Sequence, residues 1–184
     1  MAINTQIPHW PEARASGQCG DAPSDRSGDD DLDGGDDHDI LYADEGNDTL
    51  NGGLGADVLF GDAGDDVLYG DMQFGGVSGA GADTLYGGDG NDSLFANPNA
   101  NAQGAFLYGG AGNDLISGSG QADYIEAGDG KDVIIAGAGD DIVLGGAGDD
   151  SLAGGAGNDL IYGDTGGSAL IGNRITNGDF SAGL

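Results

Sequence analysis

The sequence is poor in the residues on which many folds and binding partners depend. Only four of its 184 residues are Lys or Arg, so nucleic acid is excluded as a partner, because phosphate contacts need basic side chains. The single cysteine, Cys19, excludes an internal disulfide. No apolar run is long enough for a transmembrane span, which argues against membrane insertion. High charge with 7% aromatic residues would, by itself, favour a disordered chain.

The N-terminal segment, residues 1–24, has no assignable fold. It holds three of the four prolines and the only tryptophan, Trp10. It also lacks the continuous apolar stretch of a secretory signal peptide, so we expect a chain without an N-terminal signal peptide.

Glycine and aspartate, by contrast, are abundant and follow a strict nine-residue phase. GGLGADVLF (52–60) and GGAGNDLIY (154–162) illustrate the consensus G-G-x-G-x-D-x-U-x, in which U is aliphatic. Fifteen such blocks cover residues 25–171, and the eighth position is aliphatic in every one. Two interruptions occur, at 70–77 and 96–99. A phase this regular argues against disorder and predicts a solenoid with a repeated binding site.

Each block predicts one turn followed by one short strand. Position two is Gly or a residue such as Asp44, Asp62 or Ser119, and this set favours a left-handed backbone conformation. The last three residues alternate outward, inward and outward, as in 58–60, which is strand periodicity. The eighth position therefore supplies one buried side chain per block.

The nonapeptide resembles the calcium-binding repeat of the RTX, or hemolysin-type, proteins. The resemblance implies an all-β fold, a parallel β-roll (a right-handed β-solenoid) over residues 25–171, in which two blocks make one turn and block i lies on block i+2. It also implies a secreted, extracellular bacterial protein that leaves the cell unfolded by type I secretion and folds on meeting extracellular calcium.

The charge indicates which metal would stabilise such a roll. Thirty-three acidic residues give a formal net charge of −29, and stacked turns bring carboxylates to about the strand spacing of 4.7–4.9 Å. Asp and backbone carbonyl oxygens, without soft ligands, suit Ca²⁺ better than zinc, copper or magnesium. We therefore predict multiple bound calcium ions, with the sixth-position aspartates as ligands: Asp30, Asp39, Asp48, Asp57, Asp66, Asp83, Asp92, Asp114, Asp123, Asp132, Asp141, Asp150 and Asp159. Ala105 and Ser168 break this column.

Catalytic motifs are not found, so we expect a protein that is not an enzyme. His9 and His38 lie outside any H-E-x-x-H motif, and no G-x-S-x-G motif exists. Adjacent acids recur with the repeat and so belong to its turns. An EF-hand loop beginning at Asp29 fails, because its twelfth position is Ile40 instead of Glu.

The interruption 70–77 lacks the fourth-position Gly and the sixth-position Asp, which predicts a loop extruded from the roll. Leu94 would then stack beyond Leu68 in one sheet, with Leu85 in the other. The alternative is a degenerate repeat that places Val77 in the core and moves every later block to the opposite sheet.

Outward positions seven and nine are unusually apolar. Strand propensity alone could explain this; a sharper interpretation is a face that packs against a neighbouring domain or chain. Residues 172–184 leave the repeat phase and resemble the start of a β-sandwich domain that follows such repeats. Two further roles therefore stay open: a structural or adhesive surface protein that acts through its apolar sheet faces, and the repeat region of a secreted enzyme whose catalytic domain is absent.

Overall fold

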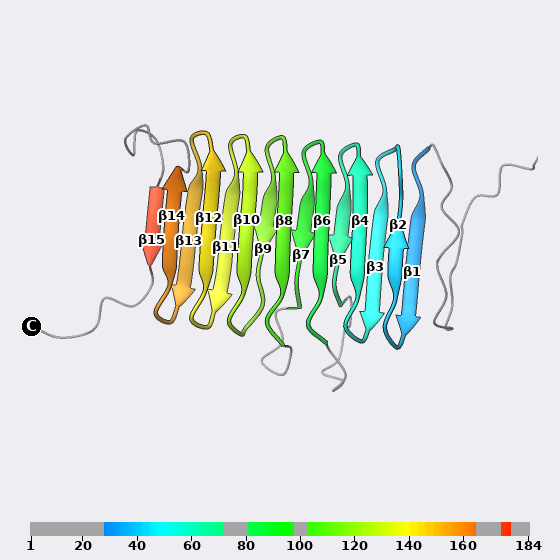
Figure 1. The fold of residues 1–184 in the computed structure, drawn as a ribbon, viewed down its shortest axis with the longest axis horizontal. Helices are drawn as coiled ribbons and strands as arrows, with labels where there is room; N and C mark the ends of the chain where they lie inside the picture. Colours follow the sequence, from blue (N-terminus) through cyan, green and yellow to red (C-terminus); the bar gives the residue numbers. More distant parts are fainter. Residues whose placement is uncertain (1–27, 72–80, 98–102, 165–173, 178–184) are drawn as a thin grey trace, which may run out of the picture.

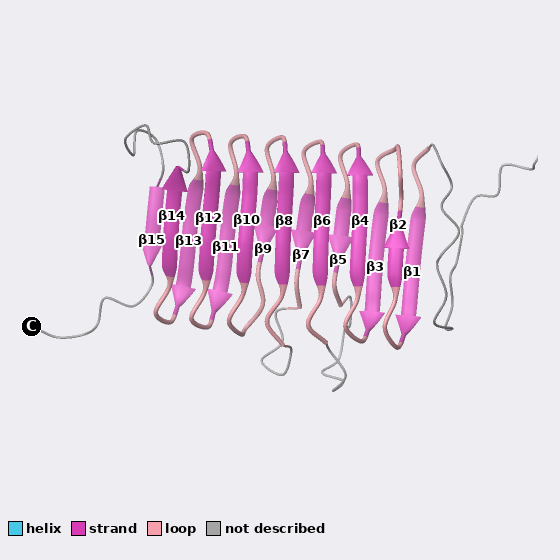
Figure 2. Cartoon of the chain, in the orientation of Figure 1, coloured by secondary structure: helices cyan, strands magenta, loops and turns pink. Residues whose placement is uncertain are grey.

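The computed structural model describes residues 28–71, 81–97, 103–164 and 174–177, and its regular elements are all strands (Figure 2). The odd-numbered strands are β1 (Asp31–Asp36), β3 (Thr49–Leu54), β5 (Val67–Tyr69), β7 (Ser93–Phe95), β9 (Leu115–Ser117), β11 (Val133–Ala138), β13 (Ser151–Ala156) and β15 (Arg174–Asn177). The even-numbered strands are β2 (Ile40–Tyr42), β4 (Val58–Ala63), β6 (Thr84–Asp89), β8 (Phe106–Ala111), β10 (Tyr124–Asp129), β12 (Ile142–Ala147) and β14 (Leu160–Asp164). No helix of the described part is long and apolar enough to cross a membrane.

Successive strands alternate between two parallel sheets (Figure 1). The odd-numbered strands form one sheet in the order β1 to β15, and the even-numbered strands form the other; we call them the odd sheet and the even sheet. Each strand pairs with the strand two positions later, so one turn of the solenoid contains two strands. The predicted parallel β-roll is confirmed.

The core is a column of eighth-position side chains. Leu50 pairs in register with Leu68, eighteen residues later, and both are fully buried. From Leu32 to Leu152 every eighth-position residue that was predicted to face inward is buried, and Ile161 is partly buried against them. Leu170 lies outside the described residues. Most blocks therefore contribute one apolar side chain to the core, the inward residue of their strand.

The register that an extruded loop predicts at the first interruption is confirmed. Leu68 pairs with Leu94, and Leu85 lies in the even sheet, where it pairs with Leu59. Partners in this region are 26 residues apart instead of 18, so eight more residues separate the paired positions. Val77 lies outside the described residues.

The structure also corrects where this loop begins. The Gly70 N–H donates to the Phe95 carbonyl at 2.9 Å, and the Gly70 carbonyl accepts from Gly53. Gly70 thus keeps position one of a regular turn. The insertion therefore begins no earlier than residue 72, and the predicted start at residue 70 is wrong.

The second interruption has the same construction in the next turn of this edge. The Ala96 N–H donates to the Ser117 carbonyl at 2.9 Å, so Ala96 takes position one and Asn97 position two. The Asn97 Nδ2 donates to Asp71 Oδ2 at 3.2 Å, which joins the two turns where their insertions begin. The extra residues therefore follow Asn97 instead of starting at residue 96. Both insertions preserve the sheet assignment of every later strand.

The last described strand extends the odd sheet beyond the predicted end of the repeats. Strand β15 pairs with β13, with Leu152 opposite Ile175, although residues 172–184 were expected to start a separate domain. The following β-sandwich stays a prediction.

The turns use left-handed backbone conformations at position two, as predicted for Asp44 and Asp62, whose φ angles are 74° and 69°. Ser119 was expected to do the same, but it does not adopt a positive φ. Glycine at position four has a second reason in most blocks: Gly55 has φ 140°, and a Cβ there would overlap the Asp37 carbonyl oxygen of the preceding turn. A glycine at such a position lets the two turns approach at strand spacing.

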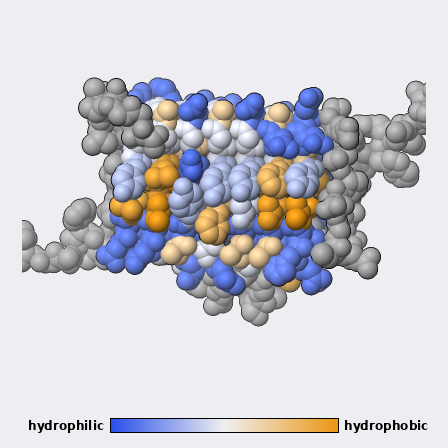
Figure 3. Space-filling view, viewed as in Figure 1, coloured by the Kyte–Doolittle hydropathy of each residue, from blue (hydrophilic) through white to orange (hydrophobic). Residues whose placement is uncertain are grey.

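The outer face of the even sheet carries a ladder of stacked aromatic rings. Tyr42, Phe60, Tyr86 and Tyr108 follow one another with ring centroids 4.7, 4.8 and 4.7 Å apart. Figure 3 shows hydrophobic residues in separate patches across the middle of the strands, with hydrophilic residues along both turn edges. Both faces of the Phe60 and Tyr86 rings are covered by neighbouring rings, so these two rings present their edges to solvent.

Candidate metal centre

The thirteen predicted aspartates fall into two columns, one at each edge of the roll. Where the chain passes from the even to the odd sheet, the even-to-odd edge, the column contains Asp30, Asp48, Asp66, Asp92, Asp114, Asp132 and Asp150. Where it passes from the odd to the even sheet, the odd-to-even edge, the column contains Asp39, Asp57, Asp83, Asp123, Asp141 and Asp159, with Ala105 between Asp83 and Asp123. Positions that are eighteen residues apart in the sequence thus become neighbours in space.

From Asp48 onward, one carboxylate oxygen of each aspartate ties its turn to the preceding one. Oδ1 of Asp48 accepts the N–H of Asp30 at 2.7 Å, and Oδ1 of Asp66 accepts the N–H of Asp48 at 2.8 Å. The odd-to-even edge repeats the pattern, since Asp57 Oδ1 accepts from Asp39 at 2.9 Å. The aspartate column is therefore part of the backbone hydrogen-bonding scheme of the roll.

The second oxygen, Oδ2, has no hydrogen-bond partner in most of these residues, although it is buried. A buried polar atom without a partner costs free energy, and it is the usual sign of a missing water or ion. A carboxylate oxygen needs a donor or a cation, and the orphaned atoms recur at turn spacing along both edges. They belong to Asp39, Asp48, Asp57, Asp66, Asp92, Asp114, Asp132, Asp141 and Asp159.

Burial without a cation makes these carboxyl groups hard to ionise. Burial raises the pKa of Asp92 to about 7, against the lowering effect of the hydrogen bond from Asp66, and the neighbouring carboxylates, Asp114 first, raise it further. The pKa of Asp83 is also raised to about 7, and those of Asp48 and Asp132 to about 6, in each case chiefly by burial. The columns therefore lack positive charge, which a divalent cation would supply.

The donor set fits calcium. Among the described residues no three His, Cys, Asp or Glu side chains converge on one metal position, so a cation would have to take part of its ligands from backbone carbonyls. Carboxylate and carbonyl oxygens in flexible geometry are the ligands that Ca²⁺ accepts. Bound there, the ion would neutralise the carboxylates and cross-link adjacent turns, while the Asp Oδ1 atoms hold the turns in register.

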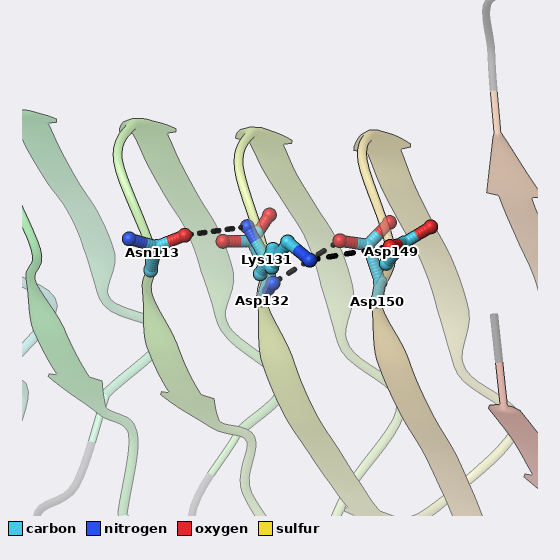
Figure 4. A network of polar contacts seen from close by, with 5 residues as sticks. All are labelled: Asn113, Lys131, Asp132, Asp149 and Asp150. Atoms are coloured by element: carbon cyan, nitrogen blue, oxygen red, sulfur yellow. Dashed lines mark hydrogen bonds and ion pairs between the residues drawn. The ribbon is translucent and has the colours of Figure 1, made fainter. Parts of the chain in front are cut away.

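A second side-chain column lies outside the first, at position five of the even-to-odd edge. Asn113 Oδ1 accepts the N–H of Lys131 at 2.9 Å, and Lys131 Nζ contacts Asp149 Oδ2 at 3.2 Å (Figure 4). Both side chains of the ion pair are exposed, so it contributes little to stability. The sequence analysis missed this column; the recurrence of Asp and Asn at position five was its available signal.

Asp123 differs from Asp39, Asp57, Asp141 and Asp159 of its column, whose Oδ2 atoms have no partner, because both of its oxygens have protein partners. Ala105 N donates to Oδ1 at 2.7 Å, and Ser119 N donates to Oδ2 at 2.7 Å. The Ser119 hydroxyl lies 2.8 Å from Oδ1 and 3.1 Å from Oδ2.

A parallel β-roll whose two turn edges carry columns of buried aspartates has the architecture of a calcium-binding solenoid. The family model "RTX calcium-binding nonapeptide repeat (4 copies)" matches residues 25–59, 42–73, 77–101, 108–143 and 135–168, and the chain belongs to this family. Calcium is the ligand of these repeats, which are typical of secreted bacterial proteins. A comparison with curated proteins found no match.

Proposed function

We propose that this chain is a non-enzymatic calcium-binding module of a secreted bacterial protein and that extracellular calcium drives its folding. The observation that carries the proposal is the series of buried, unpartnered Oδ2 atoms along both edges. In a metal-free roll each of them is a desolvated acceptor without a donor. A bound cation removes that cost at many turns at once, so binding energy becomes folding energy.

A module without catalysis is supported by the orientation of adjacent acids. Asp65 is exposed and accepts hydrogen bonds from Asn91, whereas Asp66 is buried and accepts from Asp48. The two neighbours thus belong to different columns and do not form a pair of carboxylates that could share a substrate.

Circular dichroism with the full chain tests the coupling of folding to calcium. With a chelator we expect a coil spectrum, and at roughly millimolar calcium, the range of extracellular modules, a β spectrum. Magnesium at the same concentration is the matched control and should restore less structure, because it binds preferentially in rigid octahedral sites. Equal β content with chelator and with calcium would overturn the proposal.

A second candidate function is contact with a neighbouring domain or chain through the even sheet. It is favoured by the exposed apolar side chains of that face, among them Ile40, Phe106, Ile142 and Leu160, each 40–49% exposed. Sedimentation velocity in the presence of calcium tests whether the partner of this face is a second copy of the chain. Self-association that disappears in Phe106→Ser would identify a second copy of the chain, and a monomer at all concentrations would exclude it.

A further inference from the structure

The two edges of the roll are not equivalent, because the odd-to-even column is interrupted in its middle. Ala105 occupies position six of the turn between β7 and β8, so this turn contributes no carboxylate. Its N–H still donates to Asp123 Oδ1, as the N–H groups of Asp39 and Asp141 do to the aspartates of the next turn. The even-to-odd edge has an aspartate at each corresponding position from Asp30 to Asp150.

In the following turn, between β9 and β10, Ser119 binds the Asp123 carboxylate of the same turn. Asp123 is 3% exposed, and its Oδ2, the atom that is orphaned in Asp57 and Asp141, accepts the N–H of Ser119. The Ser119 hydroxyl reaches the same carboxylate and also accepts the Gln121 N–H at 3.1 Å. Protein donors thus engage both oxygens of this carboxylate.

The cause is the residue at position two. Regular turns of this edge have glycine there with positive φ, such as Gly53 at 99° and Gly137 at 117°. Ser119 does not adopt a positive φ, and it is buried. Its N–H and its hydroxyl both lie within hydrogen-bond distance of the Asp123 carboxylate.

We propose that Ser119 takes the place of a calcium ion in the turn between β9 and β10, so that Asp123 is not a calcium ligand. Together with Ala105, this turn divides the odd-to-even calcium column into two separate segments, whereas the even-to-odd column is continuous. The inference rests on the proposed calcium function, and it would remove Asp123 from the thirteen predicted ligands.

Each feature of the turn opposes an ion at Asp123. A cation would have to displace the Ser119 N–H from Oδ2, and hydrogen bonds to a charged acceptor are stronger than neutral ones. The adjoining turn offers Ala105 instead of a second carboxylate. Asp141, in the next turn of the same column, keeps an unpartnered Oδ2 and is equally buried, which makes it the matched comparison.

Counting bound ions in the full chain by equilibrium dialysis with calcium tests the proposal. Asp141→Asn should lower the number of ions per chain, and Asp123→Asn should leave it unchanged. Ser119→Gly removes the hydroxyl and allows the positive φ of the regular turns, in which the Oδ2 atom of this column is unpartnered, so it should raise the number. Circular dichroism in saturating calcium establishes that each variant is folded.

Loss of ions in Asp123→Asn to the same extent as in Asp141→Asn would overturn this inference while leaving the calcium function intact. If Asp123→Asn does not fold, Ser119→Gly decides: an unchanged ion number overturns the replacement of calcium by the hydroxyl. A wild-type chain that binds no calcium would instead overturn the proposed function.

Discussion

At the scale of the residue, the sixth-position aspartate performs two tasks with two oxygens. In Asp132, Oδ1 accepts the N–H of Asp114 at 2.8 Å, while Oδ2 is buried without a partner. Asparagine could retain the first contact, but it would place a donor or a neutral group where a cation requires an anion. The residue type is therefore fixed by the second oxygen, and the hydrogen-bond ladder alone would not require it.

Replacing Asp132 by asparagine should weaken calcium binding roughly 10- to 100-fold, the equivalent of losing one charge-assisted interaction of about 1.5–3 kcal/mol. Asp129→Asn is the control, because Asp129 is exposed at the variable third position of the same block. Isothermal titration calorimetry measures both variants. Comparable losses of affinity would contradict the assignment of the ligand.

At the scale of the element, most strands contribute one inward side chain and are held by the strands on either side. The short strands β5, β7 and β9 span three residues each, with the burial pattern of a single inward position. The core is thus a one-dimensional stack. A cavity made by truncating one inward side chain would be bordered by the neighbouring strands of the same sheet and by the opposite sheet.

Leu94→Ala should reduce the free energy of unfolding by about 2–5 kcal/mol, since it removes a fully buried side chain from that stack. Leu115→Ala, at a 40% exposed outward position of the adjacent β9, should change it by no more than about 0.5 kcal/mol. Urea unfolding at a fixed, saturating calcium concentration measures both. Equal effects would mean that the outward face is covered and the inward column is not the core.

The sequence phase was sufficient to predict the strands, their sheet assignment and the inward leucines, because a nine-residue period leaves one aliphatic position per block. It misplaced the start of both insertions, since Gly70 and Ala96 are unremarkable residues whose backbone hydrogen bonds alone reveal their place in the turn. The contact between Ser119 and Asp123 depends on a backbone conformation that residue type did not specify.

At the scale of the whole molecule, the net charge of −29 acts along the entire length of the roll. The two acidic columns run along opposite edges, so repulsion is shared by all turns and cannot be relieved by one local change. Among the described residues one ion pair, between Lys131 and Asp149, offsets it. Stability should therefore depend on the medium more than on any single contact.

Without calcium, acidification should increase β structure. The folded-state pKa values of Asp48, Asp92 and Asp132 are raised to about 6, 7 and 6, above an unfolded value of about 3.9. A raised folded-state pKa contributes stability that is fully present below the unfolded pKa and is lost as the pH rises through 6–7. Circular dichroism in chelator between pH 7.5 and about 4.5 checks this. A spectrum independent of pH would contradict it.

When calcium is present, the effect of pH on folding should reverse, because protons and calcium compete for the same carboxylates. The calcium concentration at the folding midpoint should rise as the pH falls through the same window.

The eighteen-residue register has a consequence for how such a chain can gain or lose length. Tyr42, Phe60, Tyr86 and Tyr108 share one face because each lies two blocks after the one before it. Duplicating or deleting a single nonapeptide would move every downstream strand to the opposite sheet and split the aromatic ladder between the two sheets. Recombination that keeps this surface intact must therefore add or remove nonapeptides in pairs, that is, in units of eighteen residues.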